Sequence, residues 1–229
     1  MESQAKSPYP ELREIADPRH TAVLVVDPQN DFCSPDGSLG RDGYNMALIQ
    51  EMLPRLIRFV QDARRLGYYI IWIQQTTLPN GMSDSPAWRA FKTRNGKNPE
   101  YTLDGSWGQR FADGLVPQPG EPVVQKFRSS AFVNTTLDLV LRARGIQTVI
   151  ATGVMSHGCV EATARHASYL DYFVVYLNDC VASSNKELYD NGIKLMRFYF
   201  PVTTSTELVQ LISAPFAAAE AGSVGTHRG

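Results

Sequence analysis

The sequence predicts one α/β domain in which a parallel sheet is covered by helices on both faces. Short apolar runs rich in β-branched residues alternate along the chain with stretches whose apolar residues recur every three or four positions. No segment repeats another, and 229 residues suffice for one large domain. Such alternation is typical of βαβ units, whose right-handed crossovers return each strand parallel to the last.

Six apolar runs are predicted to be strands: 21–27, 68–75, 122–126, 146–154, 172–179 and an edge-like run at 198–204. Helices are expected over 44–67, 134–144, 156–170, 186–197 and 205–212. Gly67 closes the first helix, and Pro54 either kinks it or marks its true start. Ser205 is the expected N-cap of the last helix.

The remaining segments define the domain organisation. We predict an N-terminal arm over 1–19, the domain over 20–213 and a flexible tail over 214–229, which is rich in small residues. Within the domain, residues 76–120 contain five prolines and several aromatic residues. A long irregular stretch is usually functional, so we interpret it as a lid or pocket wall, with a plain surface excursion as the alternative.

Composition narrows the function. The net charge of −1 gives no electrostatic reason to bind nucleic acid or an anionic membrane. No apolar run approaches the roughly 20 residues that span a bilayer, and the polar N-terminal residues lack the apolar core of a signal peptide. Three cysteines without a CxxC pair suit free thiols in a reducing cytosol, so a cytoplasmic location is expected.

Three reactive side chains follow predicted strands. Asp27 ends the first strand, Lys126 ends the third, and the turn after the fourth delivers Cys159 to a helix start. Taken singly, each residue also has a structural interpretation. Asp27 could form a turn, Lys126 could be solvated at the surface, and Cys159 could pack in the core. Because carboxyl ends of parallel strands share one edge of the sheet, where ligands bind, we expect the three to converge.

This set suffices for acyl transfer. Cys159 would attack a carbonyl, and Asp27 would take the thiol proton and pass it to the leaving group. Lys126 would hold the charges in place and support an ionised thiol, whose pKa the helix N-terminus is expected to lower. The chain has no GxSxG, HExxH, CxxC, P-loop or GxGxxG pattern, so no nucleotide or other cofactor is predicted.

Three segments, VVDPQNDF, QKFRSSAF and TGVMSHGCVEATAR, resemble the signatures of the isochorismatase-like cysteine hydrolases over residues 20–212. The resemblance implies a six-stranded, mainly parallel sheet in a three-layer α/β/α sandwich. It also implies a Cys–Asp–Lys triad on Cys159, Asp27 and Lys126. A cis peptide bond between Val154 and Met155 is implied as well, with the N–H groups of Met155 and Cys159 facing a developing oxyanion.

Within this superfamily, the segment LVPQPGEPVVQKFRSSAFVNTTLDLVLRARGI looks most like the ureidoacrylate amidohydrolases and related ureido or carbamoyl amide hydrolases. That likeness implies a metal-independent amidohydrolase that cleaves a C–N bond through a thioester. Isochorismatases without the cysteine cleave a vinyl ether, so Cys159 argues against that reaction. Nicotinamidases hold a metal through histidines after the second strand, whereas QQTTLPNGMSDSPAW has none, so no catalytic metal is predicted.

Substrate contacts are predicted from position. Gln75 ends the second strand and could bond an amide group, and Arg128 could pair with a carboxylate or form a structural salt bridge. His157 stands where related amidases carry Thr-Asn or Thr-Ser, and either contacts substrate or faces solvent. The full predicted set is Asn30, Phe32, Gln75, Trp107, Arg128 and His157.

Two alternatives remain open at this point. The substrate could be another small amide, such as a biuret-like, triuret-like or nicotinamide-like compound. The chain could instead be a non-catalytic binding module on the same fold. Related proteins are commonly dimers or tetramers, so we also expect a homo-oligomer, with the aromatic-rich stretch after residue 190 as its interface.

Overall fold

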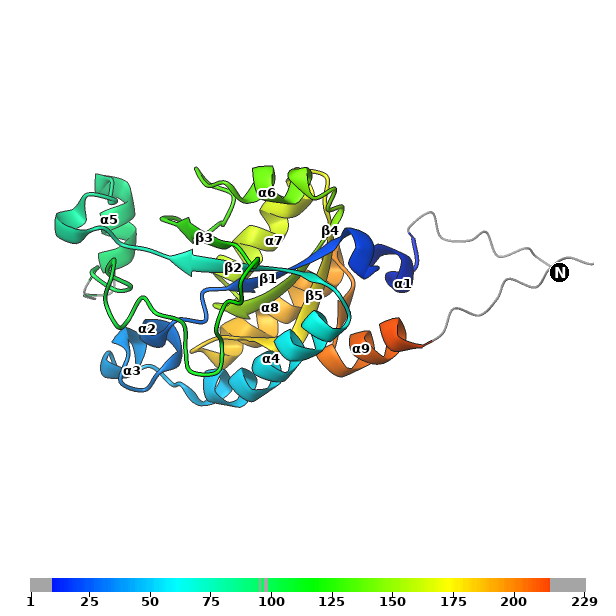
Figure 1. Ribbon diagram of the computed structural model, residues 1–229. Helices are drawn as coiled ribbons and strands as arrows, with labels where there is room; N and C mark the ends of the chain where they lie inside the picture. Colours follow the sequence, from blue (N-terminus) through cyan, green and yellow to red (C-terminus); the bar gives the residue numbers. More distant parts are fainter. Residues whose placement is uncertain (1–9, 95, 97–98, 215–229) are drawn as a thin grey trace, which may run out of the picture.

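The computed structural model describes residues 10–94, 96 and 99–214, and Figure 1 shows its ribbon. A six-stranded sheet of order β3-β2-β1-β4-β5-β6 forms the centre, and every neighbouring pair is parallel. The predicted sheet is therefore confirmed. Its strands are β1 (Thr21–Val26), β2 (Tyr69–Gln75), β3 (Val123–Lys126), β4 (Thr148–Val154), β5 (Phe173–Ala182) and β6 (Val202–Thr203).

The strand order places a topological switch in the middle of the sheet. The chain moves outward from β1 to β3, then crosses back and moves outward on the other side from β4 to β6. The crevice outside the carboxyl ends of β1 and β4 lies where the direction reverses. Open α/β sheets bind their ligands at such points.

Helices cover both faces of the sheet (Figure 1). On one face lie α1 (Leu12–Ile15), α4 (Ala47–Arg65) and α9 (Ser205–Ser213), and on the other lie α6 (Leu137–Ala143), α7 (Cys159–Tyr169) and α8 (Lys186–Tyr199). Alternate residues of β1 feed the two cores, with Val23 and Val25 in one and Leu24 in the other. Each such buried side chain contributes about 1.5–3 kcal/mol.

Helix α4 shows how an apolar stripe overrides a proline. Its buried residues recur at helical spacing from Ile49 to Ala63, and the helix runs through Pro54. The alternative that Pro54 marks the helix start is therefore wrong. Pro54 and Gln50 are both exposed, so water can satisfy the Gln50 carbonyl that loses its hydrogen bond to the missing N–H.

The second half of the predicted N-terminal arm belongs to the domain. Ile15 and Ala16 are buried in the core beside α4, and Tyr68 Oη donates to the Ala16 carbonyl at 2.6 Å. A 3-10 turn over Pro18–His20 leads into β1. Residues 1–9 of the arm and 215–229 of the predicted tail lie outside the described residues.

Two boundaries near the C-terminal end also differ from prediction. Thr204, not Ser205, is the N-cap of α9, because its Oγ1 accepts from the Glu207 N–H in a reciprocal capping box. Helix α8 continues to Tyr199, so β6 shrinks to the pair Val202–Thr203. Helical packing of α8 on the sheet outweighs the β propensity of the aromatic run at its end.

The stretch over 76–120 is less irregular than predicted. It contains the 3-10 turn η2 (Pro79–Gly81) and helix α5 (Pro86–Thr93), which begins at an N-cap serine followed by proline. Short helices α2 (Asn30–Cys33) and α3 (Ser38–Arg41) follow β1. Figure 1 shows α2, α3 and α5 at the end of the molecule toward which the β2 arrow points.

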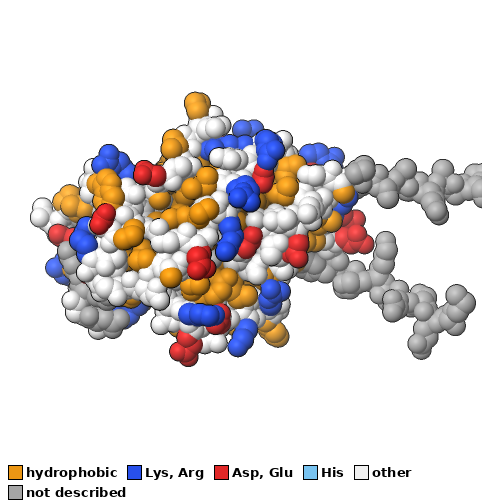
Figure 2. Space-filling model, turned by 90° about the horizontal axis from the view of Figure 1, so that it is seen from below, with side chains coloured by type: hydrophobic (Ala, Val, Ile, Leu, Met, Phe, Trp, Pro, Cys, Tyr) orange, Lys and Arg blue, Asp and Glu red, His pale blue; other side chains and the backbone are white. Residues whose placement is uncertain are grey.

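Figure 2 shows basic and acidic side chains interspersed over one face of the molecule, without a large patch of either charge. Helices of the described ranges include none that is both long and apolar enough to cross a membrane.

Candidate active site

The three reactive side chains meet at the carboxyl edge of the sheet. Asp27 directly follows β1, Lys126 is the last residue of β3, and Cys159 is the first residue of α7. Asp27 adopts φ 50°, a left-handed conformation that Asp tolerates better than most residues, and this turn ends the strand at the acid.

Lys126 lies at the centre of the group. Its Nζ is 2.7 Å from Asp27 Oδ2 and 3.3 Å from Cys159 Sγ. Nζ also donates to Gln75 Oε1 at 2.8 Å and to the Arg128 carbonyl at 3.1 Å. The side chains of Asp27 and Lys126 are fully buried. A buried ammonium with several acceptors is held in one place, so the sulfur and carboxylate are held with it.

Burial sets the protonation states of the site. It raises the pKa of Asp27, against the opposing effect of the Lys126 charge. Burial disfavours the Lys126 ammonium, but the neighbouring Asp27 and Cys159 outweigh it and the pKa of Lys126 is raised. Burial, reinforced by the Asp27 carboxylate, raises the pKa of Cys159 to about 12. The expected lowering of the Cys159 pKa is therefore wrong, because desolvation outweighs the effect of the Lys126 charge.

The turn between β4 and α7 has the expected backbone. The Val154–Met155 peptide bond is cis. Gly153 precedes it with φ 105°, and a Cβ atom there would lie 2.0 Å from the Val26 carbonyl oxygen of the neighbouring strand. In the part of the chain that the structure describes, the N–H groups of Met155 and Cys159 donate to no other group. Two unpaired donors therefore lie beside the sulfur.

A cavity of about 400 Å³ opens above Cys159, within the size range of small-molecule sites. Among its lining residues are the predicted Phe32, Gln75, Met155 and His157. The Gln75 amide is already used, because Oε1 accepts from Lys126 and Nε2 donates to the Thr76 carbonyl at 3.2 Å. Gln75 therefore positions Lys126.

Three predicted substrate contacts do not line this cavity. Asn30 Nδ2 donates to the Trp107 carbonyl at 2.9 Å, which ties α2 to the following loop, while the Trp107 side chain is 43% exposed. Arg128 Nη1 donates to the Ser83 carbonyl at 3.0 Å, and its guanidinium lies 5.0 Å from the Trp88 ring. In this structure these residues make contacts within the protein, and a role of Asn30, Trp107 and Arg128 in substrate binding stays a prediction.

His157 faces the cavity in a defined state. Its Nδ1 lies 2.9 Å from Ser183 Oγ, which also accepts from the Asn185 N–H at 3.0 Å. Burial lowers the pKa of His157, so the imidazole is neutral near pH 7. Ser183 is fully buried, and among the residues that the structure describes a deprotonated Nδ1 is the acceptor placed beside its hydroxyl. This assigns the proton of His157 to Nε2.

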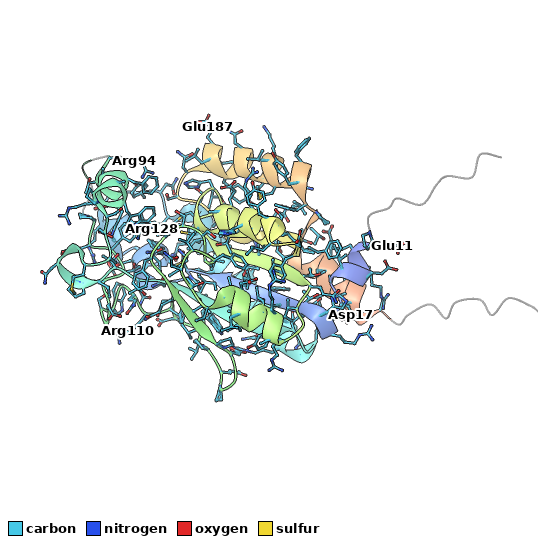
Figure 3. The ribbon with its side chains drawn as sticks, turned by 90° about the horizontal axis from the view of Figure 1, so that it is seen from above. Glu11, Asp17, Arg94, Arg110, Arg128 and Glu187 are labelled. Carbon is cyan, nitrogen blue, oxygen red and sulfur yellow. The ribbon has the colours of Figure 1, made fainter. Side chains whose placement is uncertain are left out.

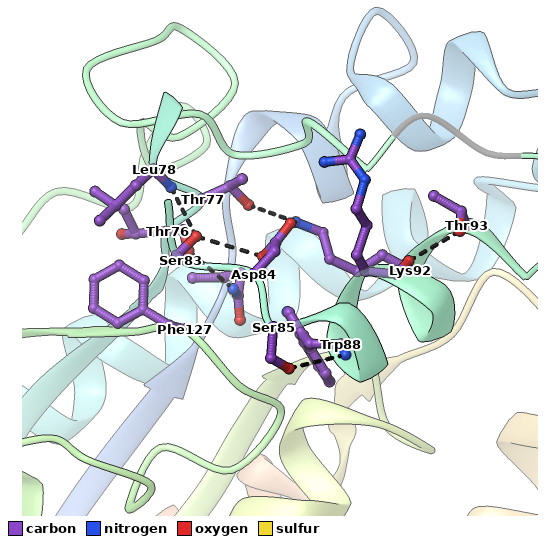
Figure 4. A network of polar contacts seen from close by, with 12 residues as sticks. Thr76, Thr77, Leu78, Ser83, Asp84, Ser85, Trp88, Lys92, Thr93 and Phe127 are labelled. Atoms are coloured by element: carbon purple, nitrogen blue, oxygen red, sulfur yellow. Dashed lines mark hydrogen bonds and ion pairs between the residues drawn. The ribbon is translucent and has the colours of Figure 1, made fainter. Parts of the chain in front are cut away.

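Helix α5 supplies the cavity wall that the sequence did not specify. Lys92 donates to Asp84 Oδ2 at 3.0 Å and to Thr77 Oγ1 at 3.1 Å, and this network fastens α5 to the end of β2 (Figure 4). Trp88 and Phe91, three residues apart, face the same cavity. The sequence does contain signals for this helix: the N-cap Ser85, the following Pro86, and the three-residue spacing of Trp88 and Phe91.

The structure can be searched for side chains that could together bind a metal ion. The residues described by the structure include no group of three or more His, Cys, Asp or Glu side chains placed to hold a metal ion. The polar groups around Cys159 are instead an amine, a carboxylate and amides, which suit proton transfer.

Comparison with known proteins places this site in a family. The family model described as the isochorismatase domain matches residues 21–207. The chain belongs to the isochorismatase family. This isochorismatase domain therefore covers every strand of the sheet and each of Asp27, Lys126 and Cys159.

Named relatives agree with this assignment. A ureidoacrylate amidohydrolase RutB from Methylobacterium radiotolerans is 37% identical over 182 residues, which cover 75% of this chain and 70% of the relative. Another RutB, from Enterobacter sp. strain 638, is 35% identical over 215 residues, covering 86% and 91%. A cysteine hydrolase from Pseudomonas syringae pv. phaseolicola 1448A matches in structure with TM-score 0.76 and 26% identity, covering 90% of this isochorismatase-family chain and 98% of that one.

Proposed function

We propose that this chain is a metal-independent cysteine amidohydrolase that cleaves the C–N bond of a small ureido or carbamoyl amide. The observation that carries the proposal is the contact of Lys126 Nζ with both Asp27 Oδ2 and Cys159 Sγ beneath the cavity. The two relatives named ureidoacrylate amidohydrolase support the ureido substrate class.

The first half-reaction forms a thioester. The Cys159 thiol is protonated at rest, because its pKa is raised to about 12. As Sγ attacks the carbonyl, the Asp27 carboxylate takes the thiol proton, and its own raised pKa makes it a stronger base. The unpaired N–H groups of Met155 and Cys159 bind the oxygen that becomes negative. The C–N bond then breaks, and the amine leaves with the proton held by Asp27.

The second half-reaction regenerates the thiol. Asp27 accepts a proton from water while the water oxygen attacks the carbamoyl thioester. The C–S bond breaks, the proton returns to sulfur, and carbamate departs. Carbamate decomposes to ammonia and bicarbonate in solution, so ammonia release reports the complete cycle. Lys126 keeps its charge throughout, which compensates each negative charge that forms on Asp27, sulfur or the carbonyl oxygen.

His157 is proposed to orient the substrate. His157 lines the cavity, and Ser183 holds its ring through Nδ1, which leaves Nε2–H as the donor for a substrate. A neutral donor suits a ureido oxygen, which accepts hydrogen bonds but carries no net charge. Phe32 contributes an apolar part of the same wall.

The direct test is ammonia release by the wild type and by the Cys159→Ala variant. The substrates are ureidoacrylate, 3-ureidopropionate, biuret, triuret and nicotinamide. We expect ureido acids to be cleaved and Cys159→Ala to be inactive with an unchanged far-UV spectrum, while Cys180→Ala, a buried cysteine away from the cavity, retains activity. Activity in Cys159→Ala would refute the proposal, and a preference for biuret or nicotinamide would select the alternative amide substrates.

Assembly and location form part of the proposal. Large apolar side chains are exposed on neighbouring helices, with Phe198 81% and Tyr169 71% exposed, and we propose that they form a homo-oligomer interface. Light scattering of wild type and Phe198→Glu tests this. The three free cysteines, including a nucleophile that must stay reduced, support a cytoplasmic location.

A further inference from the structure

The cavity above Cys159 continues into a part walled by aromatic rings. Phe32 from α2, Trp88 and Phe91 from α5, and Tyr101 from the following loop all line it. The pairs are in mutual contact, with the Phe32 and Tyr101 ring centroids 5.5 Å apart and those of Trp88 and Phe91 5.0 Å apart. This part of the cavity is therefore lined by aromatic rings, with the Trp88 and Phe91 rings stacked at 14° and the Phe32 and Tyr101 rings tilted at 59°.

Two cations contact these rings, and one of them, Arg94, also lines the cavity. The Arg128 guanidinium lies 5.0 Å from the Trp88 ring, and the Arg94 guanidinium lies 3.9 Å from the Phe91 ring. Figure 3 shows Arg94 at the end of α5 and Arg128 closer to the middle of the molecule. Arg128 follows β3, so its contact with Trp88 joins α5 to a different segment of the chain and helps to preorganise the wall.

The lysine in this wall is not available to a substrate anion. Lys92 Nζ bonds Asp84 Oδ2 and Thr77 Oγ1 and lies 4.8 Å from the Tyr101 ring, and its side chain is fully buried. An ammonium with these three partners has no donor left for a carboxylate. Arg94 also lines the cavity and could pair with a substrate carboxylate, while the rings discriminate among the groups between ureido and carboxylate by shape and contact.

We propose that this aromatic wall is a subsite for a planar conjugated group, and that the substrate is a ureido compound carrying an aryl or similarly flat substituent. The inference rests on the proposed amidohydrolase function. A flat group gains contact with the preorganised rings, whereas a flexible aliphatic chain loses rotamer freedom and makes fewer contacts. A gain of about tenfold in kcat/KM is expected from ring contact of this kind.

The test compares two ureido acids that differ in the group between ureido and carboxylate. Wild type should cleave 3-ureidobenzoate with kcat/KM about tenfold above that for 3-ureidopropionate. Phe91→Ala should reduce this ratio toward one, and Phe91→Leu, which keeps apolar bulk without a ring, should reduce it partly. Leu139→Ala is the matched control, because Leu139 is a 69% exposed apolar residue on α6 outside the cavity.

The possible results distinguish failure of the aromatic-subsite proposal from failure of the amidohydrolase proposal. A ratio of one or below in wild type, or a ratio unchanged by Phe91→Ala, would refute the aromatic subsite while leaving the amidohydrolase proposal intact. Absence of ammonia from every ureido compound would refute the proposed function itself. Phe91 is 44% exposed, so its replacement removes little core packing and the variants remain folded for the comparison.

Discussion

Replacing Asp27 by asparagine should separate two properties of Cys159 that usually change together, its reactivity toward an alkylating agent and its activity in catalysis. Asparagine keeps the size of the side chain and tolerates the left-handed backbone at φ 50°, so the turn after β1 is preserved. The change removes one negative charge and the base, and leaves Lys126 beside the sulfur.

The magnitude follows from the pKa of the thiol. At about 12, only roughly one Cys159 in 10⁵ is ionised at pH 7. Asp27 raises this pKa and Lys126 lowers it, so removing Asp27 should lower it by about 1–3. Because a less basic thiolate is also less nucleophilic, with a Brønsted coefficient near 0.5, the alkylation rate should rise about 3- to 30-fold. Amide cleavage should fall about 10²- to 10⁴-fold, since the proton acceptor is lost.

The assay is iodoacetamide labelling at pH 7, followed over time by mass spectrometry of the peptide that contains Cys159. Cys33 and Cys180 serve as internal references, because both are buried and their pKa values are raised. Asp190→Asn, an exposed exchange of the same kind on α8, should leave both rates unchanged. Slower labelling of Asp27→Asn, or retained amide cleavage, would refute the assignment of Asp27 as the base.

Four further outcomes are expected. Gly153→Ala should lower the free energy of unfolding in urea by about 2–5 kcal/mol, because it combines a positive φ with a clash, and a loss below about 1 kcal/mol would contradict this. Asp84→Ala should cost about 3–5 kcal/mol in the same assay, because it leaves the buried Lys92 unpaired, whereas Asp190→Ala should cost little. In a pH profile of kcat/KM, activity should fall as pH drops through a pKa above the ordinary Asp value of 3.8, since burial raises the pKa of Asp27 and its protonated form accepts no proton. Dialysis against EDTA should leave ammonia release unchanged, and restoration of lost activity by a divalent metal would overturn the metal-free mechanism.

Parallel-sheet periodicity accounts for what could be predicted about this chain. Buried strands such as β1 and β4 read as continuous apolar runs, and the reactive residues follow strands, so the convergence of Asp27, Lys126 and Cys159 could be predicted from position. The hydrogen bonds of Asn30 and Arg128 could not be found in this way. Their side chains donate to the carbonyls of Trp107 and Ser83, which lie in segments without a periodic pattern.

The pKa of Cys159 was mispredicted for a physical reason that applies beyond this site. A sequence shows that a cysteine begins a helix, which favours the thiolate, but it does not show how much water reaches the sulfur. Here desolvation is the largest cause and the nearby carboxylate adds to it. Depth of burial is a tertiary property, so the sign of such a shift follows from the fold and not from the local motif.

A protonated thiol changes what the surrounding residues must do. A free thiolate would be exposed to oxidation and alkylation whenever the cavity is empty, whereas a thiol of pKa about 12 resists both. Reactivity must then arise when a carbonyl arrives, which requires a base that is buried with the thiol and a cation that stabilises the charge that forms. Asp27 and Lys126 are both fully buried, and Lys126 contacts both the carboxylate and the sulfur, so the pair meets these requirements. The burial that raises the pKa of Asp27 therefore serves catalysis directly, because it makes the carboxylate a stronger base for the thiol proton.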